Sequence, residues 1–350
     1  MAHEDKPLVL VTGAGGYIAS HCVREMLEAG YRVRGTVRSL DDERKTSHLR
    51  ALPGAAERLH LVEADLTRDD GWGEAVVGAT YVLHVASPFP STVPDNEDEL
   101  VRPAVDGTRR VLEAAAATRG VVRRVVLTSS VAAIAFGHEG KDDYTFSEKD
   151  WSVLENCEPY QKSKTLAERW AWDFVGDLPD EQRFELAVIN PGFVCGPLLG
   201  TVCGTSGEVV RRLMVRDLPA CPQIGWATVD VRDVALAHRL AAETPAAAGN
   251  RYIAAGEHVW MQELATILAD EFASEGYRVP TGHLPYWLMW IVGRFDKTVR
   301  MALDYVGHRE SVSHAAAERD LGWTPRPLRE TVVDMGRSLI ERGIVPAAKA

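Results

Sequence analysis

The sequence places a tyrosine and a lysine four residues apart, Tyr160 and Lys164, directly after Pro159. Proline is favoured in the first turn of a helix, and residues four apart share a helix face, so the two side chains are predicted to be neighbours. A tyrosine hydroxyl with a pKa near ~10 exchanges protons poorly at neutral pH. A lysine ammonium beside it favours the phenolate and lowers that pKa, so the pair could serve as an acid–base group.

A serine upstream adds a third group to this pair. Thr128, Ser129 and Ser130 stand at the end of a predicted strand, Val125–Ser129. Ligands of open α/β sheets bind at the carboxyl ends of the strands, so the Ser130 hydroxyl would face the same crevice and could donate to an oxygen that gains negative charge. The Tyr-x-x-x-Lys spacing alone is common on surface helices, and the serine is what makes the combination specific.

A glycine-rich turn with Gly13, Gly15 and Gly16 follows the first apolar stretch of the chain. Gly13 and Gly16 let the backbone turn tightly and approach a pyrophosphate, whose charge is met by the N-terminus of the next helix. The spacing is G-x-x-G-x-x-A, with Ala19 as the small residue between helix and strand. A purely structural turn is the alternative, but the position after a first strand favours a dinucleotide site.

The end of the second predicted strand bears on the choice of cofactor. An NAD-binding chain would carry an acidic residue there, about 20 residues past the glycines, whereas this sequence has Arg38. Arg38 can grip a 2′-phosphate or stack on adenine, and Lys45 could add a second charge. Asp41 and Asp42 in the following loop, and a merely solvated Arg38, are the reasons for doubt. We predict NADPH.

These residues need a scaffold, and short β-branched runs alternate with helical stretches over the first half of the chain. This alternation predicts an α/β fold, a Rossmann-type doubly wound parallel sheet with helices on both faces. The expected strands are Leu8–Thr12, Tyr31–Val37, Leu59–Glu63, Tyr81–Val85, Val125–Ser129 and Leu186–Asn190. The expected helices are the one that ends at Ala29, then Gly73–Val77, Glu97–Thr118 and Gln161–Val175.

The pattern changes after Pro191. Residues 192–225 are rich in Gly, Pro and Cys. The next two segments, Ala227–Asp230 and Asp233–Glu243, are predicted to be one more strand and helix of the first domain. Residues 256–350 are helical stretches broken by prolines. We expect Asp233 near the N-cap of that helix. The expected division is an NADP-binding Rossmann domain of residues 1–191, to which 226–255 returns, and a smaller, mostly helical C-terminal substrate lobe of 192–225 and 256–350.

Composition limits the classes of partner and compartment. The net charge of -11 disfavours nucleic acid and anionic membranes, and 46% hydrophobic residues are ordinary for a globular enzyme. Five cysteines without a C-x-x-C pair match no zinc pattern and predict no metal, and with a polar N-terminus they favour the cytoplasm. The longest apolar run, Leu284–Val292, is too short to span a membrane. We interpret its stripe of Trp287, Trp290 and Ile291 as core, with a pocket wall or a membrane-surface contact as alternatives.

Taken together, these residues resemble the extended short-chain dehydrogenase/reductase family, closest to the branch of dihydroflavonol reductases, cinnamoyl-CoA reductases and microbial aldehyde or ketone reductases. The likeness covers roughly residues 7–345 and is dense to about 245. It is carried by Val11–Ser20, Thr36–Arg38, Ala64–Leu66, His84–Pro88, Pro103–Thr108, Thr128–Ser130, Tyr160–Lys164, Asn190–Val194 and Val229–Val234.

The resemblance implies roles for the matched positions. Ser130, Tyr160 and Lys164 would be the catalytic triad. The implied cofactor contacts, with those given above, are Gly13, Gly15, Gly16, Tyr17, Ile18, Arg38, Lys45, Asp65, Leu66, Val85, Ala86, Ser87, Thr128, Pro191 and Val194. Ser87, Phe89 and Phe193 would also touch substrate. Asp106 departs from the family, where many members have Asn, which puts an Asn-mediated proton relay in doubt.

The implied activity is NADPH-dependent reduction of an aldehyde or ketone to an alcohol, with Tyr160 as the proton donor. A nucleotide-sugar epimerase or dehydratase and a hydroxysteroid dehydrogenase share the fold and the triad. A non-catalytic dinucleotide sensor is the alternative from another class, although sensors tend to lose the tyrosine or lysine. We expect a monomer or a homodimer with a small-molecule carbonyl substrate.

Overall fold

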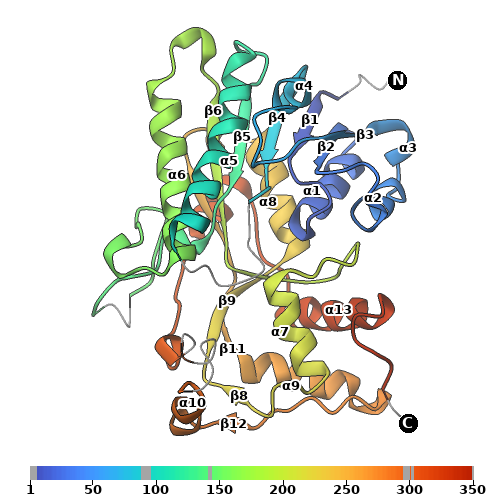
Figure 1. Cartoon of the computed structure of the whole chain (residues 1–350), viewed down its shortest axis with the longest axis vertical. Helices are drawn as coiled ribbons and strands as arrows, with labels where there is room; N and C mark the ends of the chain where they lie inside the picture. Colours follow the sequence, from blue (N-terminus) through green and yellow to red (C-terminus); the bar gives the residue numbers. More distant parts are fainter. Residues whose placement is uncertain (1–5, 88–95, 141–143, 295–299, 301–302, 349–350) are drawn as a thin grey trace.

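A parallel seven-stranded sheet forms the upper half of the molecule in the computed structural model (Figure 1), which describes residues 6–87, 96–140, 144–294, 300 and 303–348. Its strand order is β10-β6-β5-β4-β1-β2-β3, and every neighbouring pair is parallel. The strands are β1 (Leu8–Val11), β2 (Arg32–Val37), β3 (Leu59–Glu63), β4 (Ala79–His84), β5 (Arg124–Thr128), β6 (Glu185–Pro191) and β10 (Arg251–Ala254).

Helices cover both faces of this sheet, because its strands are apolar on both sides. On one face α1 packs against α8, and on the other α5 packs against α6 and α4. Each face has its own buried core, one centred on Val9, Met26 and Val234, the other on Leu10, Leu112 and Leu186. The helices of this half are α1 (Tyr17–Glu28), α2 (Glu43–Arg50), α3 (Ala55–Arg58), α4 (Trp72–Val76), α5 (Asp98–Ala117), α6 (Pro159–Asp177) and α8 (Val231–Glu243).

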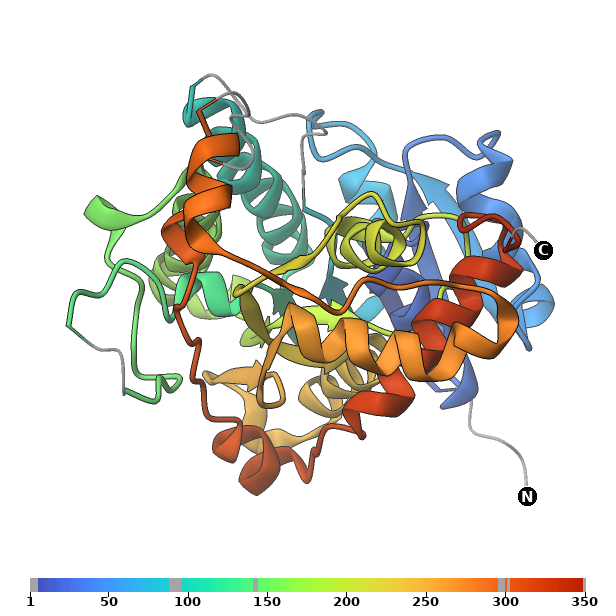
Figure 2. The ribbon, with the colours of Figure 1, turned by 90° about the horizontal axis from the view of Figure 1, so that it is seen from below.

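A smaller lobe lies below the carboxyl ends of the strands (Figures 1 and 2). It holds a three-stranded sheet in the order β11-β9-β7, a short β8–β12 pair, and helices that share a third core around Leu213, Leu264 and Met335. Its strands are β7 (Phe193–Cys195), β8 (Cys221–Pro222), β9 (Gly225–Asp230), β11 (His258–Trp260) and β12 (His283–Leu284). Its helices are α7 (Gly204–Met214), α9 (Met261–Phe272), α10 (Tyr286–Val292) and α13 (Leu328–Glu341), and α12 (Ala315–Leu321) packs back on β10 and α8.

The predicted fold class is confirmed, with two corrections to its elements. The six strands predicted before Pro191 are present within two residues of their expected ends. Ala227–Asp230 is a strand, β9, but it belongs to the small sheet, and the seventh strand of the main sheet is Arg251–Ala254. The N-cap of α8 is Asp230, which accepts from the Arg232 backbone N–H at 2.8 Å, so the helix begins at Val231, two residues before the predicted start. Asp233 lies near the N-cap, in the first turn, as expected, and accepts two hydrogen bonds from Arg326.

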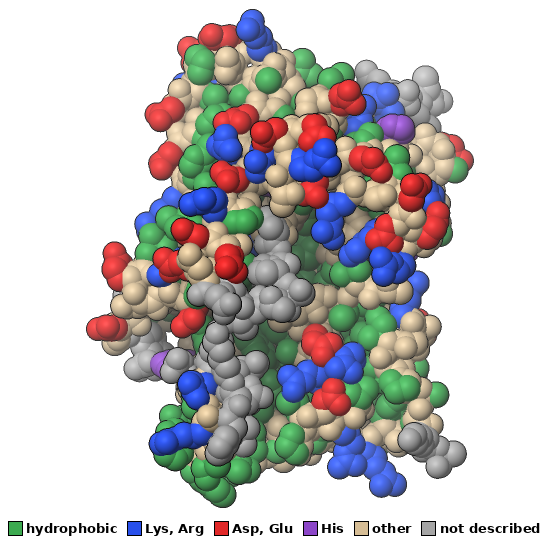
Figure 3. All heavy atoms as spheres, viewed as in Figure 1, with side chains coloured by type: hydrophobic (Ala, Val, Ile, Leu, Met, Phe, Trp, Pro, Cys, Tyr) green, Lys and Arg blue, Asp and Glu red, His purple; other side chains and the backbone are tan. Residues whose placement is uncertain are grey.

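The apolar stripe of α10 is exposed, so its interpretation as core was wrong. Trp287, Trp290 and Ile291 are 63%, 47% and 44% exposed, whereas Met289 is buried. Hydrophobic side chains accordingly gather at the lower end of the molecule in Figure 3, where α10 lies in Figure 1. Within the described part of the chain, no helix has the length and apolar character that crossing a membrane requires.

Candidate active site

The glycine turn between β1 and α1 is packed so tightly that side chains are excluded. Gly13 has φ +65°, and a Cβ there would lie 2.9 Å from the Ala86 Cβ; a Cβ at Gly15 would lie 2.6 Å from the Lys45 carbonyl oxygen. Gly16 is the N-cap of α1 and supplies no side-chain cap, so the first backbone N–H groups of the helix stay available to an anion. This turn therefore fits the pyrophosphate of a dinucleotide.

Two cations lie near each other at the end of β2. Arg38 is exposed, and the pKa of Lys45 is lowered by burial and then by repulsion from Arg38. Such a pair favours a dianionic ligand between its members. Asp42, the acid that raised doubt, caps α2 through the Arg44 N–H at 3.2 Å and pairs with the Arg44 guanidinium at 3.0 Å. The basic end of the pocket thus fits the 2′-phosphate of NADP.

The tyrosine–lysine pair stands at the start of α6, as predicted. Pro159 begins the helix, and the Gln161 Oε1 accepts from the Glu158 N–H at 2.6 Å, which closes a capping box around Tyr160. The Tyr160 hydroxyl is hydrogen-bonded to Ser130, which follows β5 and whose Oγ also accepts from the Ala132 N–H at 3.1 Å. Strand end and helix start therefore bring two hydroxyl groups together at one point.

The pKa values of Tyr160 and Lys164 differ from those expected from the sequence. Burial raises the pKa of Tyr160, and the hydrogen bond from Ser130 lowers it only in part, so the lowered pKa predicted from Lys164 is not present. Burial instead lowers the pKa of Lys164 to about 8, against the opposing effect of Glu168. The physical reason is that burial penalises the charged form of each group, the phenolate of Tyr160 and the ammonium of Lys164. Tyr160 is thereby kept in its protonated form, the form that can donate.

Lys164 is backed by a buried ion pair that no sequence motif indicates. Glu168, one turn further along α6, accepts from the Arg251 Nε at 2.5 Å and from the Asn190 amide at 2.9 Å. The Arg251 guanidinium also lies 3.7 Å from the ring centroid of Trp151. The Glu168–Arg251 pair joins α6 to β10, and the Asn190 bond joins α6 to β6, so Glu168 fixes the helix that carries Lys164. A small cavity of about 20 Å³ separates Lys164 from neighbours that include Ser87, Thr108, Ser129 and Glu168.

One large cavity at the carboxyl ends of the main sheet is lined by the glycine turn, the two cations and the hydroxyl and ammonium groups described above: Arg38, Lys45, Ser130, Tyr160 and Lys164. Its volume of about 1940 Å³ exceeds the roughly 300–1,000 Å³ of ordinary ligand pockets, which suits a dinucleotide and a second molecule together. The predicted site residues that line it are Gly13, Gly15, Gly16, Tyr17, Ile18, Arg38, Lys45, Asp65, Leu66, Val85, Ala86, Ser87, Thr128, Ser130, Tyr160, Lys164, Pro191, Phe193 and Val194. Phe89 lies outside the described residues.

Two of these predicted residues are oriented by partners on other elements, and a third by a neighbour in its own loop. The Tyr17 hydroxyl donates to the Gly196 carbonyl at 2.7 Å, and the Thr128 hydroxyl contacts the His238 Nε2 at 2.6 Å. Asp65 accepts from the Thr67 N–H at 2.9 Å. Asp106, by contrast, does not line the cavity and forms an ion pair with Arg109 at 3.5 Å.

Apart from Phe193, several residues of the cavity wall, from the lower lobe and from the loop after β5, were not revealed by the sequence. The Phe193 and Trp226 rings stack with centroids 4.4 Å apart, and Glu310 lies with them on the cavity wall. Further lining residues from outside the motifs are Phe136, His138, Phe146, Tyr305, His308 and Arg309. No spacing or motif marks these positions, since they come from irregular segments that only the folded chain brings together.

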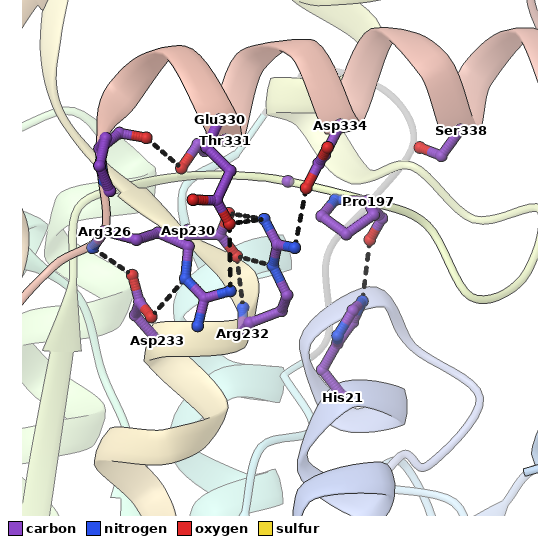
Figure 4. Close-up of polar contacts among 12 residues, drawn as sticks. His21, Pro197, Asp230, Arg232, Asp233, Arg326, Glu330, Thr331, Asp334 and Ser338 are labelled. Carbon is purple, nitrogen blue, oxygen red and sulfur yellow. Dashed lines mark hydrogen bonds and ion pairs between the residues drawn. The ribbon is translucent and has the colours of Figure 1, made fainter.

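A polar network holds the lower lobe against the sheet half (Figure 4). Arg232, on α8, bonds Asp230 beside it and Asp334 on α13, each at 2.8 Å, while Asp233 binds Arg326 ahead of α13. The Asp230 side chain is completely buried, so this pairing is needed to keep its charge satisfied. Both walls of the cavity are thereby held in register.

Comparison with known proteins extends over both lobes. The model of the NAD dependent epimerase/dehydratase family matches residues 9–256. Cinnamoyl-CoA reductase 1 of Petunia hybrida is 37% identical over 343 residues, 97% of this chain and 94% of that protein. Tetraketide alpha-pyrone reductase 1 of Arabidopsis thaliana is 34% identical, over 97% of each chain. The structure of yeast methylglyoxal/isovaleraldehyde reductase complexed with NADPH superposes with a TM-score of 0.79 at 28% identity, over 95% of this chain and 98% of that one.

Proposed function

Because the chain belongs to the NAD-dependent epimerase/dehydratase family, in its extended short-chain dehydrogenase/reductase branch, we propose that it reduces an aldehyde or ketone to an alcohol with Tyr160 as the proton donor. The chain is an NADP-dependent oxidoreductase. The observation that carries the proposal is the hydrogen bond between Tyr160 and Ser130 in the cavity that also holds the glycine turn and Arg38. Dinucleotide, acid and substrate would then meet in one space.

The proposed division of labour follows from the elements. The N-terminus of α1 would bind the pyrophosphate, Arg38 and Lys45 the 2′-phosphate, and Lys164 the nicotinamide ribose. NADPH, when bound, supplies the hydride for the carbonyl carbon. Residues 1–191 with 226–255 would form the cofactor domain, and residues 192–225 and 256–350 the substrate lobe.

The protein's own part in the reaction is to hold and polarise the carbonyl oxygen. The Ser130 and Tyr160 hydroxyls, already hydrogen-bonded to each other, would both donate to that oxygen as it gains negative charge. Tyr160 then gives up its proton to the oxygen, and its raised pKa keeps that proton in place until the oxygen becomes basic. Lys164, an ammonium below pH about 8, stabilises the phenolate that remains.

Substitution of the tyrosine tests this proposal. Tyr160→Phe removes the donor and keeps the ring, so kcat should fall by roughly 10²–10⁴-fold, the usual contribution of a general acid. NADPH binding, measured by quenching of tryptophan fluorescence, should stay within about twofold. The matched control is Tyr31→Phe, because Tyr31 bonds Glu243 away from the cavity. Full activity in Tyr160→Phe would refute the assignment.

The substrate class is tested with a panel of aldehydes, ketones and CoA thioesters against NADPH and NADH, followed at 340 nm. We expect oxidation of NADPH with at least some aldehydes or ketones, and a lower kcat/KM with NADH because it lacks the phosphate that Arg38 faces. Purified protein that retains NAD and ignores added NADPH would instead support an epimerase. Saturable NADPH binding without consumption across the panel would support a sensor.

A further inference from the structure

A carboxyl group stands in the wall of the large cavity, on the side of the lower lobe. Glu310 lines the cavity, and its Oε2 accepts a long hydrogen bond from the Ala227 N–H at 3.4 Å. Its Oε1 is buried and has no hydrogen-bond partner among the residues that the structure describes. Burying a carboxyl oxygen without a partner is costly, so the protein alone leaves this group unsatisfied.

The backbone fixes this carboxyl in place. The Glu310 N–H donates to the His258 Nδ1 at 3.1 Å, and the Gly307 N–H donates to the Gln223 carbonyl at 2.8 Å on the segment before β9. Two residues further on, Val312 forms a bridge with Phe146. The same segment also contacts α6, the helix that carries Tyr160, because the Tyr305 hydroxyl accepts a hydrogen bond from the Gln161 side chain at 2.8 Å. Glu310 is therefore held at a set position relative to Tyr160.

The surroundings of Glu310 are apolar, with few charges. The stacked Phe193 and Trp226 rings and Phe136 line the same cavity. His258 on β11 accepts from the Glu310 N–H, and the other titratable groups of the lower and middle cavity wall are His138, Glu139, Glu158, Tyr160, Lys164, Glu208, Tyr305, His308 and Arg309. None of them forms a described bond to the carboxyl oxygens. Accordingly burial is the first cause that raises the pKa of Glu310, to about 7, and the Ala227 N–H opposes it.

We propose that Glu310 is a specificity-determining residue that accepts a hydrogen bond from a hydroxyl group on the apolar body of the carbonyl substrate. The proposal rests on the proposed reductase function and names the chemistry that its substrate carries. A hydroxyl suits the site better than an ammonium group, because it can pair with both the protonated and the ionised carboxyl and brings no charge that must be dehydrated among aromatic rings. A hydroxyl that approaches the carboxyl from the cavity also supplies a stronger donor than the Ala227 N–H, which lies 3.4 Å from Oε2.

Matched substrates test the proposal. The probes are benzaldehyde, 3-phenylpropanal and 3-phenylpropenal, each unsubstituted, with a 3- or 4-hydroxyl, and as the corresponding methyl ethers, which accept but cannot donate. Because a hydrogen bond to a charged group contributes about 1.5–3 kcal/mol, the wild-type protein should prefer at least one hydroxylated probe over its unsubstituted form and its ether by roughly 10–100-fold in kcat/KM, mainly through KM.

Variants show whether Glu310 causes this preference. Glu310→Leu should abolish it while turnover of the unsubstituted aldehydes continues, and Glu310→Gln, which can still accept and donate, should keep much of it. The control is Glu257→Gln, an exposed carboxylate of the same lobe outside the cavity, which should behave as wild type. In the wild type the preference should grow as pH rises through 7, since the ionised carboxyl is the stronger acceptor, and in Glu310→Gln it should not.

The outcomes separate this inference from the proposed function. Failure of the wild type to reduce any probe with NADPH counts against the proposed function itself. Reduction without a preference for hydroxylated probes, or a preference that survives in Glu310→Leu, overturns the role of Glu310. Stronger turnover of a 4-aminomethyl probe than of the 4-hydroxy probe would also overturn it, in favour of a cation subsite. If Glu310→Leu does not fold, the pH profiles of wild type and Glu310→Gln still decide.

Discussion

At the scale of single residues, the two titratable groups at the centre of the site differ in how burial acts on them. Burial raises the pKa of Tyr160 and lowers the pKa of Lys164 to about 8, so both are pushed toward their neutral forms. Tyr160 stays protonated throughout the physiological range. Lys164 is the group that changes charge first as pH rises, and it should set the alkaline limit of the reaction.

We therefore expect kcat/KM for reduction to fall as pH rises through about 8. The direction follows from the lysine: below its pKa it is an ammonium that can support cofactor and phenolate, and above it the charge is lost. Lys164→Arg keeps a cation at every accessible pH, so its alkaline fall should move above pH 10. NADPH affinity measured against pH by fluorescence provides the second readout, and it should weaken above pH 8 in the wild type only. A wild-type profile still flat at pH 9 contradicts this role.

Arg38 belongs to the same scale, because a single guanidinium would distinguish the two nicotinamide cofactors. Arg38→Ala should raise the KM for NADPH by about 10–100-fold, the weight of a hydrogen bond to a charged group, and leave the KM for NADH nearly unchanged. Arg44→Ala is the matched control, since Arg44 is engaged with Asp42 nearby but does not line the cavity. Equal effects of Arg38→Ala on both cofactors would show that Arg38 stacks on adenine and does not read the phosphate.

At the scale of elements, the sequence predicted those parts whose pattern is local. The first six strands, the glycine turn and the helix of Tyr160 each carry an apolar run, a glycine or a proline at the boundary, and all lie where expected. Strand β10 was missed because Arg251–Ala254 is only four residues long and begins with a buried arginine. That arginine is explained by Glu168, which lies 83 residues earlier, and no local rule connects the two.

The junction of β9 and α8 illustrates the same limit. Asp230-Val231-Arg232-Asp233 offers two acids that could cap a helix, and the sequence analysis placed Asp233 near the N-cap without identifying Asp230 as the capping residue. The choice depends on α13, about 100 residues later, whose Asp334 holds Arg232 and whose preceding segment supplies Arg326 to Asp233. Because these partners lie about 100 residues away in the sequence, the residue that caps α8 could not be predicted from the local pattern.

This junction carries a prediction about stability. Arg232→Ala leaves the wholly buried Asp230 carboxylate without its partner and removes the link to α13, so the free energy of unfolding should fall by about 3–5 kcal/mol. The control is Arg319→Ala at the exposed Arg319–Asp320 pair, where solvent screens the charges and little or no loss is expected. Urea unfolding followed by circular dichroism measures both. A loss of less than 1 kcal/mol in Arg232→Ala would mean that the network does not stabilise the lobe contact.

At the scale of the whole molecule, the site is a product of both lobes. The cofactor end of the cavity consists of strand ends and turns, which the sequence marks with glycines and an arginine. The end at which we propose that the substrate binds includes Trp226, Tyr305 and Glu310, which no sequence motif marks. The chemistry could therefore be predicted from the sequence, whereas the features that select a substrate required the folded chain.

The whole fold also has a pH dependence that should be visible as loss of stability in acid. His21, His84 and His238 are buried, and burial lowers their pKa values to about 3, about 3 and about 4. Below pH ~6.5 the unfolded chain binds protons at these histidines that the folded chain does not, so stability falls as pH falls. Glu310 acts in the opposite direction, because its raised pKa of about 7 lets the folded chain hold one proton that the unfolded chain releases above pH ~4.5.

Between pH 6.5 and 4.5, unfolding thus takes up three protons at the histidines and releases one at Glu310, a net uptake of two. We expect the free energy of unfolding to fall by up to about 2.7 kcal/mol per pH unit in this range. His238→Asn should reduce this slope by about one proton. Urea titrations at half-unit steps measure the slope, and a free energy of unfolding that stays constant from pH 7 to 5 would show that these histidines are not held neutral by the fold.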